Sequence, residues 1–145
     1  MNNFTKIFPS FFLFTVYCLL PTSFCFSQNP DIKRTYHWYF GNQAGLDFSS
    51  GSAVPDVNGV YNNFEGCATF SDTAGNLLFY TDGETVYNKN HQAMQNGTNI
   101  GGCWSATQGA LIAPEPNNDS IFFVFTTGCA TALATGLRYS VINMK

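Results

Sequence analysis

The feature that most constrains the fold is a pair of continuous apolar runs at a fixed spacing. Leu77–Tyr80 and Phe122–Phe125 start 45 positions apart (122 − 77 = 45), and the same shift places Thr81 on Thr126. A period of about 40–45 residues with three or four strands is the spacing of a β-propeller blade. We therefore expect an all-β protein of about two propeller-like blades, preceded by a partial one.

Turn residues frame the first run on both sides. Asp72–Asn76 has turn chemistry, because Asp and Asn bond their own backbone and Gly accepts positive φ. Asp82-Gly83 is a two-residue hairpin signal. Because a continuous apolar run is typical of a strand covered on both faces, both runs are predicted to be inner strands. The strands predicted here are Glu65–Ser71, Leu77–Tyr80 and Thr85–Tyr87.

Weaker signals lie on either side of this stretch. Leu137–Ile142 alternates apolar and polar residues, so it predicts a strand with one wet face. Asn88–Gly102 is rich in Asn and Gly and is interpreted as a surface loop. The other strand candidates are Tyr36–Phe40, Leu46–Phe48 and Gly109–Ala113.

The number of repeats raises a question of size. A closed propeller needs at least about four blades, and this chain supplies two and a part. Open blades would leave apolar faces in water at about 25 cal/mol per Å². We therefore expect the chain to be the N-terminal piece of a longer protein or an interrupted reading frame. The alternative is a small β-sandwich with two similar hairpins.

The N-terminus has the pattern of a secretory signal peptide. Lys6 supplies a positive charge, Ile7–Leu20 is apolar, and Cys25 and Ser27 occupy the −3 and −1 positions before Gln28. The apolar run is shorter than the ~20 residues of a membrane span. We predict a signal peptide at 1–27, a propeller-like domain at 28–145, and a secreted or cell-surface location.

Composition argues against several classes of partner. The chain carries a net charge of −3 and only 10% charged residues. A nucleic-acid binder has a basic face, and binding to anionic lipid needs a cluster of Lys and Arg; neither is present in the sequence. Glycine pairs do not lie between a strand and a helix, so no nucleotide cofactor is expected. We expect no nucleic acid, no membrane contact by the mature chain and no cofactor.

The cysteines allow one disulfide. Cys18 and Cys25 leave with the signal peptide, so 5 − 2 = 3 cysteines remain. Cys67 lies in a predicted strand and is interpreted as a small core residue. Cys103 and Cys129 lie in Gly-rich loops and are the favoured pair if a bridge forms, the alternative being three free thiols.

Four segments resemble a known family: HWYFGNQAGLDFSSG, FEGCATFSDTAGNLLFYTDGETVYNKNHQAMQNGT, TQGALIAPEPNNDSIFFVFTT and GLRYSVINM. They are similar to the N-terminal region of large secreted proteins of gliding bacteria. Those proteins contain PKD or Ig-like repeats and a C-terminal gliding-motility or type IX secretion sorting domain. The resemblance covers roughly Trp38 to Met144 and implies a propeller-like module on an exported, often surface-attached protein. No PKD-like repeat or sorting domain follows here, and no catalytic residues are implied.

Few residues suggest catalysis or metal binding. His37 and His91 stand 54 positions apart outside any zinc motif, so neither is assigned as a ligand. Glu65, Asp82 and Glu84 flank adjacent strands, and they would have to converge to hydrolyse a glycosidic bond. In the alternative interpretation Asp82 is a turn residue, and Glu65 and Glu84 are solvated residues at strand ends.

Asp72 and Asp82 are the candidates for a calcium turn, although the EF-hand loop pattern is missing. Trp104 is the candidate platform for a stacked sugar, or alternatively a cover for a blade edge. We therefore expect a non-catalytic interaction module that binds surface glycan or protein, as in adhesion. A secreted glycan-active hydrolase and a structural spacer are the alternatives.

Overall fold

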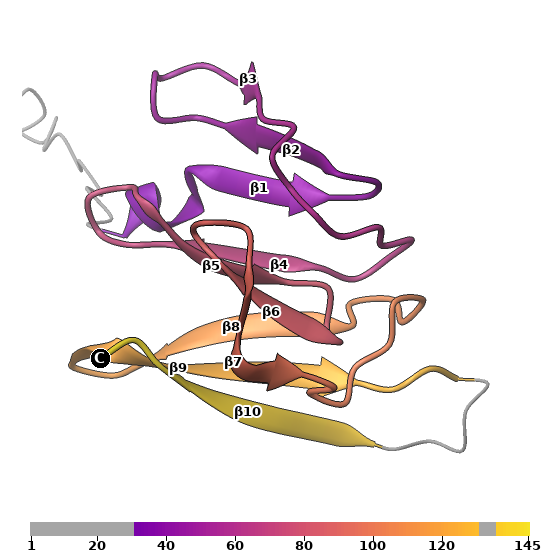
Figure 1. The fold of residues 1–145 in the computed structure, drawn as a ribbon. Helices are drawn as coiled ribbons and strands as arrows, with labels where there is room; N and C mark the ends of the chain where they lie inside the picture. The colour runs from indigo at the N-terminus through magenta and orange to yellow at the C-terminus, as the bar shows by residue number, and fades with distance from the viewer. Residues whose placement is uncertain (1–30, 131–135) are drawn as a thin grey trace, which may run out of the picture.

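Apart from one short 3-10 turn, every regular element of the described residues is a strand, which confirms the all-β class. The computed structural model describes residues 31–130 and 136–145; the predicted signal peptide lies outside them. After a short 3-10 turn, η1 (Ile32–Thr35), the described residues form three antiparallel sheets (Figure 1). Among these residues, no helix is long and apolar enough to cross a membrane.

Each sheet is a meander of consecutive strands. The first contains β1 (His37–Phe40), β2 (Ala44–Asp47) and β3 (Val54–Pro55). The second contains β4 (Ala68–Ser71), β5 (Leu77–Thr81), β6 (Thr85–Asn88) and β7 (Ala93–Thr98). The third contains β8 (Ala110–Glu115), β9 (Asn118–Thr127) and β10 (Leu137–Asn143).

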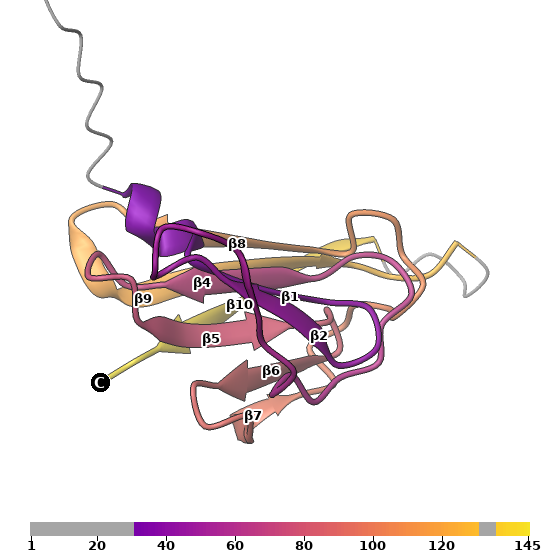
Figure 2. The ribbon, with the colours of Figure 1, turned by 90° about the horizontal axis from the view of Figure 1, so that it is seen from above.

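The sheets are stacked in chain order. Figure 1 shows the first sheet at the top, the second in the middle and the third at the bottom, and Figure 2 shows the first sheet lying over the second. The leading strands β1, β4 and β8 are neighbours, because β4 contacts both of the others. Three stacked meanders are compatible with a propeller-like fragment and with a layered sandwich; adjacent leading strands favour the former.

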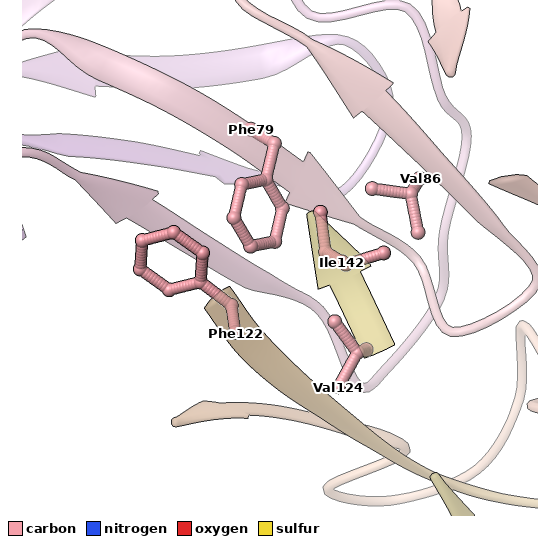
Figure 3. Packing of buried hydrophobic residues seen from close by; sticks show 5 residues of the cluster. All are labelled: Phe79, Val86, Phe122, Val124 and Ile142. Carbon is pink, nitrogen blue, oxygen red and sulfur yellow. The ribbon is translucent and has the colours of Figure 1, made fainter. Parts of the chain in front are cut away.

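The core between the second and third sheets centres on a cluster of apolar side chains. Its centre is the pair Phe79 and Phe122, whose rings meet edge to face with centroids 5.3 Å apart. Val86 on β6 and Val124 on β9 complete the contact with Ile142 on β10 (Figure 3). Burial of each such side chain contributes about 1.5–3 kcal/mol, so this core holds the two sheets together.

The core between the first and second sheets is made of tyrosines. The rings of Tyr39 on β1 and Tyr80 on β5 lie 4.6 Å apart, and Tyr61 packs 5.4 Å from Tyr80. Buried phenols need hydrogen-bond partners. Tyr61 donates its O–H to the backbone carbonyl of Tyr39, so the polar tip is satisfied within the core.

The two apolar runs occupy equivalent places but differ in burial. In β5, Phe79 faces the third sheet and Tyr80 faces the first, and both are 0% exposed. The prediction of a strand covered on both faces is confirmed there. In β9 only one face is covered: Phe122 and Val124 are buried, whereas the intervening Phe123 and Phe125 are half-buried. The same prediction is wrong for β9, because no sheet in the described chain lies over its outer face.

The 45-residue shift places β5 on β9, the second strands of their sheets, but it does not place the first strands β4 and β8 in the same pairing register. Thr81 pairs with Ala68, whereas Thr126 pairs with Ala110 and not with Ala113. The connection between β4 and β5 has five residues (72–76) and the one between β8 and β9 has two (116–117). The shorter connection does not explain the offset (113 − 110 = 3), because from partner to partner the β8–β9 hairpin is the longer one (126 − 110 = 16 against 81 − 68 = 13). The extra residues lie in the longer strands β8 and β9, whose register shifts between Pro114 and Glu115.

Two further expectations need correction. The predicted loop Asn88–Gly102 contains β7, which pairs with β6. In Leu137–Ile142 the face predicted to be wet is only partly exposed: Arg138 is exposed, Ser140 is half-buried and Ile142 is buried, whereas Tyr139 and Val141 on the other face are exposed.

Candidate functional site

Four loop segments meet at one end of the stack, which is called the loop end here. They are residues 62–66, 82–84, 99–109 and 128–130, at the right of Figure 1. Backbone bonds join them: Gly102 N–H donates to Gly83 O (2.9 Å), and Gly66 N–H donates to Ala106 O (3.2 Å). A Cβ atom on Gly66 or Gly102 would overlap the backbone of the adjoining loop. The two glycines therefore permit this close packing.

The hairpin between β5 and β6 fixes the position of Asp82. Its Oδ1 accepts the backbone N–H groups of Glu84 (2.9 Å) and Thr85 (2.7 Å). Gly83 supplies the positive φ of the turn, 89°. The buried carboxylate of Asp82 therefore stabilises the turn and is not presented to a ligand.

An exposed aromatic pair dominates the surface of the loop end. Trp104 is 46% exposed and Phe64 is 72% exposed, and their ring centroids lie 4.8 Å apart at 54°. The backbone N–H of Phe64 donates to the carbonyl of Trp104 at 3.3 Å. The two rings therefore form one platform, and Trp104 packs on a ring that the sequence did not single out.

Two carboxylates flank the platform. Glu84 Oε1 accepts the backbone N–H of Trp104 (3.3 Å), and Glu65, which is next to Phe64 in the chain, accepts the hydroxyl of Thr107 through Oε2 (2.8 Å). Of the three predicted carboxylates, Glu65 and Glu84 thus both lie at the loop end and bond residues of the segment 99–109. Asp82 lies below them within its turn.

A disulfide lies under the platform. Cys103, next to Trp104, is joined to Cys129 with Cα atoms 5.3 Å apart, and Cys103 itself is buried. These are the two cysteines that the sequence favoured. Among the described residues, Cys67 carries a free thiol, which donates to the carbonyl of Tyr39 at 3.2 Å. Cys67 was predicted to lie in a strand, but it comes immediately before β4, which begins at Ala68.

The loop end therefore offers a ligand two aromatic faces and two carboxylates on a braced backbone. Comparison with protein families, curated proteins and solved structures finds no match.

A hollow lies between the first two sheets, towards the opposite end of the stack. Its volume is about 550 Å³, and both His37 and His91 line it. The histidines are 54 positions apart in the sequence (91 − 37 = 54), which gave no sign that they line one hollow. Among the described residues, no group of three or more His, Cys, Asp and Glu side chains is placed to hold a metal ion.

The electrostatic centre of this hollow is Asp56. Burial opposes its ionisation, but hydrogen bonds from Tyr39 O–H and from Asn58 outweigh burial and lower the pKa of Asp56. Tyr80 O–H contacts Nδ1 of His91 at 3.2 Å. The polar groups here mainly satisfy one another, so the hollow is a weaker candidate than the platform.

The predicted calcium pair is not assembled. Asp72 precedes β5 and Asp82 follows it, so the strand separates them. Asp72 accepts the backbone N–H groups of Ala74 (2.8 Å) and Asn76 (2.9 Å). Both aspartates therefore serve their own turns.

Proposed function

We propose that the protein is a non-catalytic binding module of an exported protein, and that the Phe64–Trp104 platform holds a glycan. The observation that carries the proposal is an exposed aromatic pair on a braced backbone. A pyranose ring presents an apolar C–H face that stacks on an aromatic ring, and its hydroxyls donate to carboxylates. Trp104 and Phe64 supply the stacking surface, and Glu65 and Glu84 supply the acceptors.

The sequence supports the cellular setting. The signal-peptide pattern at 1–27 favours export. The resemblance to the N-terminal region of PKD-repeat, type IX-sorted proteins favours a surface role such as adhesion. The uncharged character of the rings matches a neutral saccharide better than nucleic acid, which needs a basic face.

Tryptophan fluorescence tests the proposal. The sequence contains two tryptophans, Trp38 and Trp104, so in a Trp38→Phe background the emission reports on the platform alone. Binding of a cell-surface oligosaccharide identified on a glycan array is expected to shift this emission saturably. Calorimetric titration with the same glycan, which needs no tryptophan, is expected to show affinity weakened by about tenfold or more, or about 1.4 kcal/mol, in Trp104→Ala and in Phe64→Ala.

The control is the other exposed tryptophan. Trp38 lies on β1 in the first sheet, away from the loop end, so Trp38→Ala is expected to leave glycan affinity unchanged. Equal loss of affinity in the Trp38→Ala and Trp104→Ala variants would refute the platform. A folded protein that binds nothing on the array or in surface extracts would favour the spacer.

A secreted glycan-active hydrolase is the second candidate, because Glu65 and Glu84 flank the same rings. Hydrolysis by paired carboxylates predicts release of new reducing ends from the bound glycan. Loss of that release in Glu65→Gln and Glu84→Gln, with binding retained, would establish it. Absence of release from a bound glycan leaves the non-catalytic module.

A further inference from the structure

The outer face of the third sheet is a continuous apolar surface. Side chains alternate along each strand, and the register places the outward residues of all three strands side by side: Tyr139 lies opposite Phe125, and Leu111 lies opposite it on the other side. Leu137 is 72% exposed, Tyr139 65% and Leu111 62%. A monomer rarely leaves such a face in water, so an exposed patch of this kind marks an interface.

This face also has relief. Phe123, Phe125 and Tyr139 form a triangle of rings with centroids 6.3–6.5 Å apart. Beside it a hollow of about 650 Å³ is lined by Phe125, Leu111 and Leu137 among others. A partner that fits this face must therefore bring protruding apolar side chains and no charge.

The other end of the stack presents side chains of that kind. In β1, Tyr39 points to the second sheet, so Trp38 and Phe40 point outward, and they are 51% and 39% exposed. Trp38 packs on Phe48 with centroids 5.1 Å apart and pairs with Leu46 across the sheet. The outer face of the first sheet is therefore also uncharged and carries projecting aromatic rings.

The two internal interfaces give the mode of packing. Within the chain, the first sheet packs on the second and the second on the third, each time through apolar or aromatic side chains of the inner strands. If the same sheet-on-sheet packing is repeated once more, another sheet lies on the outer face of the third sheet. The sheet with a matching apolar face that the protein itself supplies is the first sheet of another molecule.

We propose that a second copy of this chain docks head to tail, with the outer face of its first sheet on the outer face of the third. In a two-fold dimer both such contacts form, because each copy offers both faces. Three sheets from each copy make a ring of 2 × 3 = 6 sheets, within the range of about four to eight blades that closed propellers use.

The mass of the mature chain in solution tests the proposal. Light scattering after size exclusion is expected to give twice the chain mass at micromolar concentration. Tyr139→Lys places a charge at the centre of the third sheet's outer face and is expected to raise the dissociation constant by 100-fold or more, giving monomer. Phe64→Lys is the matched control: an exposed aromatic outside both faces, expected to stay dimeric.

Mixing variants distinguishes head-to-tail docking from other dimers. Trp38→Lys, or Phe40→Lys if the former is misfolded by circular dichroism, damages only the outer face of the first sheet. Tyr139→Lys mixed with either variant still allows one intact contact, so a heterodimer is expected although each variant alone is monomeric. A monomeric parent chain, a dimer that Tyr139→Lys leaves intact, or a mixture without heterodimer would each overturn the proposal.

Discussion

At the scale of single residues, Tyr39 connects the first sheet to the second. Its ring stacks on Tyr80, its backbone N–H donates to the hydroxyl of Thr69 (3.1 Å), and its own O–H donates to Asp56. The sequence marked Tyr39 as part of an aromatic strand and no more. Its partners lie 17 to 41 positions away (56 − 39 = 17, 80 − 39 = 41), and no local pattern reports contacts at such separations.

Tyr39→Phe is expected to lower the free energy of unfolding by about 1–2 kcal/mol at neutral pH, because it removes a hydrogen bond to an ionised carboxylate. The pKa of Asp56 is lowered in the folded protein. Its contribution is therefore present above the unfolded value of about 4 and is lost as the pH falls below it. Urea unfolding of both proteins at neutral and acid pH measures this; an equal difference at both would contradict it.

The buried tyrosines predict sensitivity to alkali. Burial raises the pKa of Tyr80 to about 12, and burial also raises the pKa values of Tyr39 and Tyr61. Groups with a raised pKa stabilise the fold below the ordinary value of about 10 and lose that contribution as the pH rises further. Unfolding free energy is expected to fall from about pH 10 to about pH 12, and less steeply in Tyr80→Phe. A flat profile would rule this out.

At the scale of elements, β5 and β9 show how much a run of apolar residues predicts. The runs Leu77–Tyr80 and Phe122–Phe125 both formed second strands of their meanders, with turns where Asp and Gly or Asn indicated them. Whether both faces are covered depends on what stacks above, and the runs contain no information on that. Of these two strands, β5 has a described sheet on each side and β9 has one on a single side.

The strand β7 (Ala93–Thr98) was missed for a different reason. Its sequence AMQNGT is polar and contains Asn and Gly, which are depleted in strands. It lies at the outer edge of its sheet, paired only through β6 among the described residues. At that position only Gly97 is buried, so tertiary pairing overrides local preference.

Phe79→Ala is expected to cost about 3–5 kcal/mol, because it empties a fully buried site between two sheets. Phe64→Ala deletes the same side chain at an exposed position and is expected to cost at most about 1 kcal/mol. Denaturant unfolding of the two variants separates a core strand from a surface platform. Similar losses in both would mean that β5 is not the centre of the fold.

At the scale of the whole molecule, the sequence predicted the class and the repeat but not the closure of the stack. The third sheet lacks a counterpart of β7, and its outer face is uncovered in the described chain. The candidate surface was half predicted: Trp104 was identified by itself, and Glu65 and Glu84 were identified as carboxylates that could converge. Their convergence with Phe64 depends on loops that meet only after the sheets have stacked.

The disulfide gives a prediction at this scale. It closes a loop with a sequence separation of 26, so Cys103→Ala with Cys129→Ala is expected to lower the free energy of unfolding by about 3 kcal/mol. Reductant should bring the parent protein to the level of the double variant and leave the variant unchanged. Alkylation before reduction should label Cys67 alone; labelling of all three would show that no bridge forms.

Different interactions hold the sheets together at the two ends of the stack. Opposite the loop end, the guanidinium of Arg34 donates to Asp31 at 2.7 Å and to Asp119 at 2.9 Å, and lies 5.4 Å from the ring centroid of Phe70. These contacts of Arg34 connect the N-terminal turn to the second and third sheets. At the loop end the corresponding connection is the Cys103–Cys129 disulfide. High salt weakens the ion pairs of Arg34, and a reductant breaks the disulfide. Amide hydrogen exchange should therefore begin near Arg34 at high salt concentration, and at the loop end in dithiothreitol.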